Sequence, residues 1–332
     1  MKQSAKKLDE NHVRRTLVQV ARLYYEENQS QQEIADRLGV SRSLIAQYIQ
    51  RARDAGIINI QIIDQDDSCS DLALELQQKT GVQHVKVVPN PHVSQELALR
   101  AVATVAADFL SSQLREGDRF GLAWGRTNHM VVDLLKPPHV QGVDVFPLMG
   151  ESGISGMHSQ MNQLVVRAAE QLNATPHFLS LPMVVSAPEL CDGLMQEVGM
   201  RDVIGRWDRI NLACLGVGVV PPVPGMVVYI GEEHLPRLVE AGAVGDMCGI
   251  YFDREGNIIE TGLENRMIAA TAEQLKAIDN LAVVACGTDK ADAVLGAART
   301  GLISTLFIDQ SMAEKILAGL AAADRPKIGA GK

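Results

Sequence analysis

The sequence predicts a small helical domain at the N-terminus followed by a larger α/β domain. Three observations support this division: helical periodicity with capping signals in the first sixty residues, repeated strand–glycine–helix alternation further on, and a polar, acidic stretch between them. The length of 332 residues also suggests about two domains. We place the first domain at 1–63, a linker at 64–71 (DQDDSCSD) and the second domain at 72–332.

Three consecutive helices are expected in the first domain. Apolar residues recur at helical spacing between Val13 and Asn28 (Val13, Leu17, Val20, Ala21 and Tyr24). Ser30 and Glu33 form a capping-box pattern that predicts the start of a second helix, and Gly39 predicts its end. The third helix is expected from Arg42 to about Ala55, with its apolar stripe at Leu44, Ile45, Tyr48, Ile49 and Ala52. A short β segment at 57–63 follows.

The second and third helices, joined by a tight turn, have the layout of a helix-turn-helix. In that motif the start of the second helix enters the major groove of DNA. The exposed candidates for DNA contact are Arg42, Ser43, Gln47, Gln50 and Arg51. Arginine can pair with guanine and glutamine with adenine, whereas Arg51 and Arg53 suit phosphates. The alternative is a helical hairpin used only for oligomerisation.

The second domain alternates strands and helices in the manner of a parallel sheet with crossover helices. Strands are predicted at 119–124, 143–148, 210–215, 281–285 and 302–308, and helices near 127–135, 290–299 and from about 311. A hairpin turn is predicted at 253–257. Ligands of parallel sheets bind outside the carboxyl ends of the strands, where the glycine turns of this sequence are expected to cluster.

Composition narrows the class of protein. Hydrophobic residues make up 46% and charged residues 21%, which is typical of a globular protein. Residues 1–63 carry a net charge of +3, from ten basic and seven acidic residues; the rest carries −12, from 21 basic and 33 acidic residues. A basic head on an acidic body favours a DNA-reading module joined to a sensor. The sequence has no signal-peptide pattern, no membrane-length apolar run and five scattered cysteines, so we expect a cytoplasmic protein with reduced thiols.

Both domains resemble one known family. The run QSQQEIADRLGVSRSLIAQYIQRARDAGIINIQI is similar to the winged helix-turn-helix of the sorbitol-operon regulator (SorC) family, the SorC/DeoR-type sugar-binding regulators. Leu44, Ala46 and Gln47 replace residues that are common in its recognition helix, which changes the expected operator sequence. Four motifs of the body match in order: FGLAWGRT at 120–127, VFPLMG at 145–150, GAVGDMC at 242–248 and ACGTDK at 285–290, with Cys286 in place of a glycine.

The resemblance implies a transcriptional regulator of a carbohydrate or polyol operon. It implies a Rossmann-like sensor domain related to sugar-phosphate isomerases, a small and typically phosphorylated sugar-like effector, and a homo-oligomer, either a dimer or a tetramer. The partners expected from it are operator DNA, the effector and further copies of the chain. No cofactor is expected.

Two glycine turns carry the strongest candidates for effector binding. Gly125, Arg126 and Thr127 lie where a strand meets a helix, and the free N–H groups of such a turn attract anions. Arg126 could add a bidentate contact to phosphate or carboxylate. Lys290 follows the Gly287 turn, and the family motif favours a phosphate contact there. The alternatives are a tight packing turn at Gly125 and a solvated lysine.

Further candidates are Gly150, Glu151 and Asp246. Glu151 and Asp246 are expected to lie at glycine turns and could accept hydrogen bonds from sugar hydroxyls. An aspartate that stabilises a turn is the alternative for Asp246. Gly216 and Gly218 could let the backbone approach a ligand.

Other conspicuous residues have structural interpretations. Trp124 and Trp207 suit packing, the eight histidines lack metal-ligand spacing, and Cys286 lacks an identifiable histidine partner for nucleophilic chemistry. A competing hypothesis is a sugar-phosphate isomerase or deaminase with a DNA-binding appendage, for which Asp246 and Asp289 are the candidate bases. A purely structural oligomerisation protein would leave the helix-turn-helix and the glycine turns unexplained.

Overall fold

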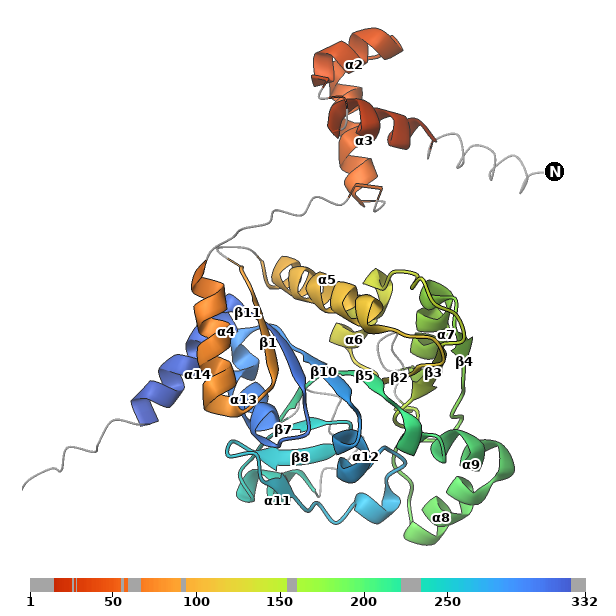
Figure 1. The fold of residues 1–332 in the computed structure, drawn as a ribbon, viewed down its shortest axis with the longest axis vertical. Coiled ribbons are helices and arrows are strands. Elements are labelled where there is room, and N and C mark those ends of the chain that lie inside the picture. The colour runs from red at the N-terminus through yellow and green to blue at the C-terminus, as the bar shows by residue number, and fades with distance from the viewer. Residues whose placement is uncertain are drawn as a thin grey trace, which may run out of the picture. The chain divides into compact units, whose positions relative to one another are not determined.

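The computed structural model describes residues 15–25, 27, 29–54, 57–58, 67–90, 94–153, 160–221 and 234–323. Its contacts divide the chain into two compact units, residues 1–65 and 66–332. We call the first unit the head and the second the body, and describe each by itself (Figure 1).

The head is built from three helices around a small apolar core. Residues 15–25 are helical and are followed by α2 (Gln31–Leu38) and α3 (Arg42–Asp54). Ile34, Ile45 and Ile49 are buried in this core together with residues of the first helix. The predicted helix-turn-helix is therefore confirmed. Val13 and most of the expected β segment at 57–63 lie outside the described residues.

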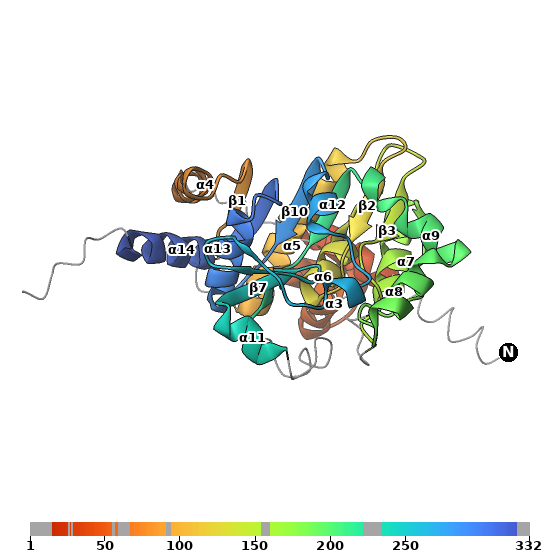
Figure 2. The ribbon, with the colours of Figure 1, turned by 90° about the horizontal axis from the view of Figure 1, so that it is seen from below.

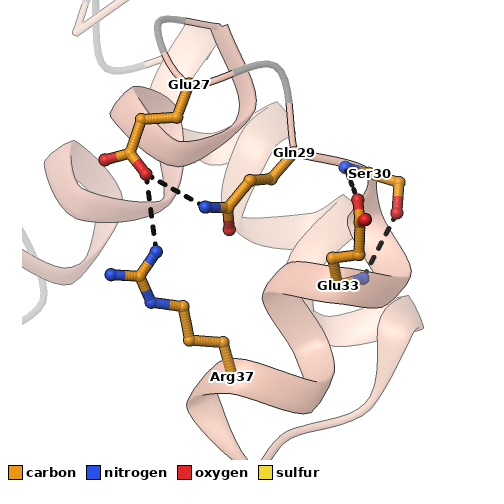
Figure 3. Close-up of polar contacts among 5 residues, drawn as sticks. All are labelled: Glu27, Gln29, Ser30, Glu33 and Arg37. Carbon is orange, nitrogen blue, oxygen red and sulfur yellow. Dashed lines mark hydrogen bonds and ion pairs between the residues drawn. The ribbon is translucent and has the colours of Figure 1, made fainter.

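The capping signals act as the sequence predicts (Figure 3). Ser30 Oγ accepts a hydrogen bond from the Glu33 backbone N–H at 3.3 Å, and the Glu33 carboxylate accepts one from the Ser30 N–H at 2.7 Å. This reciprocal box also lowers the pKa of Glu33. Gly39 ends α2 in the left-handed conformation, with φ 66°, which a residue with a side chain rarely adopts. Ser41 Oγ accepts from the Leu44 N–H at 3.3 Å at the start of α3.

The predicted linker at 64–71 is partly wrong. The first helix of the body, α4, spans Asp67–Thr80 and so includes the second half of that stretch. Acidic residues are stabilising in the first turn of a helix, so the charge that suggested a linker also suits a helix start. Further along, Leu76 is fully buried in the core of the body.

The body is built on a seven-stranded parallel sheet with the order β1-β11-β10-β5-β2-β3-β4. The strands are β1 (His84–Val88), β2 (Arg119–Leu122), β3 (Asp144–Pro147), β4 (Thr175–Pro176), β5 (Leu212–Leu215), β10 (Asn280–Val284) and β11 (Thr305–Asp309). All five strands predicted for this domain are present, which confirms the α/β class. Two further strands, β1 and the two-residue β4, were not predicted from the sequence and form the two edges of the sheet (Figure 1).

The chain winds in two directions from the centre of this sheet. From β2 it proceeds through α6 (Arg126–Leu134) to β3 and through α7 (Met161–Leu172) to β4; from β10 it proceeds through α13 (Ala291–Arg299) to β11 on the other side. The order of the strands therefore reverses between β2 and β5, which are neighbours. Crevices at the carboxyl ends of strands at such a switch point are the usual ligand sites of doubly wound folds.

Long helices complete the layers around the sheet. The 19-residue α5 (Gln95–Gln113) connects β1 to β2 and contacts α6, which contacts α7. At the β1 edge, α4 and α14 (Gln310–Ala323) lie side by side in both views (Figures 1 and 2). Shorter elements are α8 (Pro188–Gln196), α9 (Val198–Ile204), α11 (Leu235–Glu240), α12 (Ala272–Lys276) and the 3-10 turns Trp207–Arg209, Glu264–Arg266 and Thr288–Lys290.

A second, antiparallel sheet packs against α13 with the order β6-β7-β8-β9. Its strands are β6 (Gly218–Val219), β7 (Ala243–Met247), β8 (Ile250–Asp253) and β9 (Ile258–Ile259). The predicted hairpin turn at 253–257 is confirmed, since it joins β8 to β9. Asp246 lies in β7 rather than in a glycine turn.

The core of the body is mainly aliphatic, with Phe120, Phe146, Phe252 and Phe307 fully buried. Trp207 is 1% exposed, and its indole N–H donates to the Pro147 carbonyl at 2.8 Å. This confirms its expected packing role. Among the described helices, none is both long and apolar enough to cross a membrane.

Candidate functional site

The candidate DNA-contacting residues lie on one helix of the head. Arg42, Ser43, Gln47, Gln50 and Arg51 all belong to α3 and are all exposed. The opposite face of α3 is held by the buried side chains of Ile45, Ile49 and Ala52. The Ser43 hydroxyl lies 3.0 Å from that of Ser41, so it takes part in the start of the helix as well.

Polar contacts tie α3 to the first helix and α2 to the segment that follows the first helix. The Arg53 guanidinium donates to the Tyr25 hydroxyl at 2.6 Å through Nη2 and at 3.1 Å through Nε. Arg53 was expected to hold a phosphate, but the structure assigns it to tying α3 to the first helix. Similarly, Arg37 of α2 pairs with Glu27 at 3.4 Å (Figure 3). The remaining exposed cations of α3 are Arg42 and Arg51.

In the body, the structure brings Arg126, Thr127 and Lys290 together. They line a cavity of about 620 Å³, which we call the cleft. Arg126 and Thr127 begin α6 after β2, and Lys290 follows β10, so the cleft lies at the carboxyl ends of strands beside the switch point. The other lining residues are Gln95, Glu96, Leu99, Arg100, His129, Met130, Asp133, Leu134 and Cys286.

Lys290 is the most constrained cation of the cleft. Its Nζ donates to the Val217 carbonyl, after β5, at 2.8 Å. Burial lowers the pKa of Lys290, the nearby positive charge of Arg126 lowers it further, and Asp289 and Asp246 oppose the change. A partly buried ammonium beside a second cation does not fit the alternative of a solvated surface lysine. It is a suitable partner for an anion.

Asp246 approaches Lys290 from the second sheet. Burial raises its pKa, while a hydrogen bond from the Gly249 N–H at 3.3 Å and the charge of Lys290 lower it. The bond to Gly249 stabilises the turn between β7 and β8, the alternative interpretation of this residue. A Cβ on Gly218 would lie 2.0 Å from Asp246 Oδ1, so Gly218 leaves room for the carboxylate.

The Gly125 turn has the predicted geometry. Gly125 is the N-cap of α6, with φ 137°, and no side chain caps the helix there. Asn128, fully buried one turn later, donates to the Ala123 carbonyl at 2.6 Å and to the Cys214 carbonyl at 3.4 Å. These bonds tie α6 to the loop after β2 and to β5, so they fix the direction of the helix start.

The Gly287 turn is fixed by a buried carboxylate. Asp309, 1% exposed at the end of β11, accepts from the Gly287 N–H at 2.9 Å and from Asn90 Nδ2 at 2.8 Å. Asn90 Oδ1 in turn lies 3.2 Å from the Ser311 N. This network, which the sequence analysis missed, joins the loop before Lys290 to β11 and to the segment after β1.

Gly150 and Glu151 are not among the residues that line the cleft. A Cβ on Gly150 would lie 2.6 Å from the Leu181 carbonyl oxygen, so close backbone packing explains this glycine. The Glu151 carboxylate accepts hydrogen bonds from the Met161 and Asn162 N–H groups at 2.8 and 2.9 Å. Both of its oxygens thus cap α7, a role that its position after a glycine did not reveal.

Cys286 lines the cleft but is poorly suited to nucleophilic chemistry. Burial and the negative charge of Asp309 raise its pKa to about 12, so the thiol stays protonated at neutral pH. Within the described ranges, no group of three or more His, Cys, Asp or Glu side chains could hold a metal ion.

The sequence analysis also missed Gln95 and Arg100. Gln95 begins α5, and its side-chain amide lies against Gly287. A Cβ on Gly287 would be 2.5 Å from Gln95 Nε2. Arg100, one turn further on, adds a third cation to the cleft. The capping serine Ser94, whose Oγ accepts from the Leu97 N–H at 3.4 Å, could have located this helix start.

Family comparisons cover nearly the whole chain. Residues 65–318 match the family model described as "Putative sugar-binding domain", and residues 22–55 match that of Sigma-70, region 4. The second match covers the helix-turn-helix of the head.

Similar proteins align over both units. The chain is 27% identical to a deoxyribonucleoside regulator of Bacillus subtilis (strain 168), covering 90% of this chain and 96% of the relative. It is also 27% identical to the sorbitol operon regulator of Klebsiella pneumoniae, covering 91% and 98%. The crystal structure of the full-length Klebsiella regulator superimposes with a TM-score of 0.75, covering 91% of this chain and 98% of that one.

Proposed function

This chain belongs to the SorC/DeoR-type family of sugar-binding transcriptional regulators, and from that premise we propose that its cleft binds the anionic group of a small phosphorylated sugar or polyol. The protein is a DNA-binding regulator controlled by a small sugar-like effector. Its relatives over nine-tenths of the chain are named as regulators, so the isomerase hypothesis is not retained.

The observation that carries the effector proposal is the juxtaposition of Arg126 and Lys290 in one cavity. The positive charge of Arg126 lowers the pKa of Lys290, so the two cations repel each other without a ligand. A phosphate bound between them would offset this repulsion and would meet free N–H groups at the start of α6. Thr127 would add a hydroxyl. Asp246, which is not among the residues that line the cleft, would act through its negative charge near Lys290.

In the head, we assign base reading to Arg42, Ser43, Gln47 and Gln50, and phosphate contact to Arg51. These side chains are exposed along α3, and arginine and glutamine have the donors that base edges require. Paired operator half-sites need at least two heads, so we propose a cytoplasmic homodimer or homotetramer.

Thermal unfolding in the presence of sugars, polyols and their phosphates tests the effector proposal. A specific ligand at a hundred times its Kd should stabilise the body by about 2.7 kcal/mol. The Lys290→Ala and Arg126→Ala variants should each weaken a phosphorylated ligand roughly tenfold or more, because each loses a charge-assisted contact.

Lys315→Ala is the matched control. Lys315 donates to the Thr288 carbonyl at 2.9 Å on the same turn, but it is exposed and does not line the cleft. Its loss should leave the affinity unchanged. A ligand that binds Lys290→Ala as well as the wild type would contradict the assignment of the cleft.

A further inference from the structure

A second cationic cavity lies at the amino end of β2, whereas the cleft lies at the carboxyl ends of the strands. Arg119, Arg201, Arg206 and Arg209 line a hollow of about 770 Å³, larger than the cleft. We call it the arginine hollow. Arg119 begins β2, Arg201 lies in α9, Arg206 caps the 3-10 turn after α9, and Arg209 ends that turn.

The position of the hollow separates it from the cleft. Arg119 is the first residue of β2, at its amino end, whereas Arg126 follows the carboxyl end of the same strand. The α9 helix lies on the β3 side of the sheet, away from β1, in both views (Figures 1 and 2). No residue lines both cavities.

The backbone around the hollow is well anchored. Buried Trp207, between Arg206 and Arg209, is held by its hydrogen bond to the Pro147 carbonyl. The Asn211 N–H donates to the Arg119 carbonyl at 3.3 Å, which ties the end of the turn to β2. The arginines therefore lie on backbone segments that hydrogen bonds hold in place.

Within the part of the chain that the structure describes, acidic residues compensate only part of the charge of the hollow. Among the described residues that line it, Asp202 is the only acidic one, and it pairs with Arg206 at 3.2 Å. Within the described part of the chain, Arg119, Arg201 and Arg209 take part in no ion pair, and the buried Arg119 Nε has no hydrogen-bond partner. A buried donor without a partner is costly, so this geometry calls for an acceptor from outside the chain.

We propose that the arginine hollow is a second small-molecule site, specific for a ligand with two or more phosphate groups. Guanidinium groups bind phosphate oxygens in bidentate fashion, and several of them in one concavity match several phosphates. The residues after position 63 carry a net charge of −12, so this local excess of cations is a feature of the hollow and not of the whole surface. That acidic surround would repel the long polyanionic backbone of a duplex, which favours a small ligand over DNA.

Inorganic pyrophosphate is the probe, measured by isothermal titration calorimetry with the full-length protein. The background is the Arg126→Ala/Lys290→Ala double variant, which removes two of the three cations of the cleft, the two proposed to hold the anion. This background should still bind pyrophosphate, and adding Arg201→Gln and Arg209→Gln should weaken that binding at least tenfold. Arg119 is left intact because it is partly buried.

The matched control adds Arg237→Gln and Lys276→Gln to the same background. Both residues are exposed, lie on α11 and α12, and line neither cavity. The control has the same loss of charge and should bind as the background does. Circular dichroism and melting of each variant confirm that the fold is kept.

Three results would overturn the proposal. They are a background that binds no pyrophosphate, arginine substitutions that leave its binding unchanged, and a control that weakens it equally. The other source of phosphate is the DNA backbone. Binding of a DNA duplex of unrelated sequence, measured by fluorescence anisotropy, tests this source. If the hollow substitutions weaken duplex binding and not pyrophosphate binding, the hollow contacts DNA and the small-ligand proposal is wrong.

Discussion

The recognition helix of the head and the cleft of the body present cations in opposite ways. The α3 helix carries Arg42 and Arg51 on an exposed face, nine positions apart on one helix. The cleft joins Arg126 to Lys290 across 164 positions of sequence and buries part of the lysine. An exposed surface suits an extended polyanion that arrives with its own counterions, whereas a partly desolvated cavity suits one small anion.

The largest effect should follow from removing the apolar support of α3. Ile45 is fully buried in the small core of the head, so Ile45→Ala should destabilise the head by about 2–5 kcal/mol. Thermal denaturation followed by circular dichroism should show an earlier transition for the head, with the transition of the body unchanged. Val40→Ala, at an exposed position of the turn, serves as the control. A single unshifted transition with intact DNA binding would contradict the separate stability of the two units.

Arg42 and Arg51, the exposed cations of α3, should contribute to DNA binding in different ways. Arg42→Ala should cost about 1–3 kcal/mol in operator binding and relax sequence preference, because a base contact is lost. Arg51→Ala should weaken specific and non-specific duplexes alike and reduce the salt dependence by about one counterion. Fluorescence anisotropy at several salt concentrations measures both. Equal losses of specificity in the two variants would show that the division of roles is wrong.

A substitution of Glu151 should show that this acid has a structural role and does not bind the effector. Glu151→Gln should lower stability by about 0.5–2 kcal/mol, since the carboxylate caps α7 with both oxygens. Effector affinity should remain within error of the wild type. Denaturant unfolding and a ligand titration check the two parts. A large loss of affinity with unchanged stability would restore Glu151 to the effector site.

The smallest effect should be the pH dependence that Lys290 gives to the cleft. Its folded-state pKa is lowered, so its charge is lost at a lower pH than that of an ordinary lysine. Affinity for a phosphorylated effector, whose phosphate is fully ionised above neutral pH, should therefore fall as the pH rises toward 10.5. Between the lowered pKa and 10.5 the unfolded chain binds more protons, so the stability of the unliganded protein rises with pH in that window.

Titrations from pH 7 to pH 10 test this dependence. A Lys290→Arg variant stays charged over the whole range and should give a flatter profile. A wild-type profile as flat as that of the variant would mean that Lys290 makes no charged contact with the effector.

The sequence predicts features of short range much better than those of long range. The Ser30–Glu33 box, the Gly39 cap and the five central strands follow from neighbouring residues, and the structure confirms them. Glu151 capping α7, Asp309 holding the Gly287 turn and the approach of Gln95 depend on residues 10 to 192 positions apart. Such contacts follow from the order of the strands, which the periodicity of a single segment does not contain.

The linker shows a different reason for failure. Its acidic composition fits both a solvated connection and the first turn of a helix, and the packing of α4 against β1 and α14 favours the helix. The β7 strand escaped notice for a related cause. Gly245, beside Asp246, suggested a turn but lies within β7. A Cβ at this position would be 2.7 Å from the Ala293 Cβ of α13, so close packing explains the glycine.

The buried Asp309 gives the molecule a mechanical linkage. Its carboxylate holds the Gly287 N–H with one oxygen and the Asn90 amide with the other, so the turn before Lys290 cannot shift freely. A ligand that displaces this turn must either break one of these bonds or pull Asn90 along. Asn90 follows β1, and β1 packs against α4, the first helix after the head. A displacement of the Gly287 turn would thus be transmitted through Asp309 and Asn90 to β1 and α4, the part of the body from which the chain leads to the head.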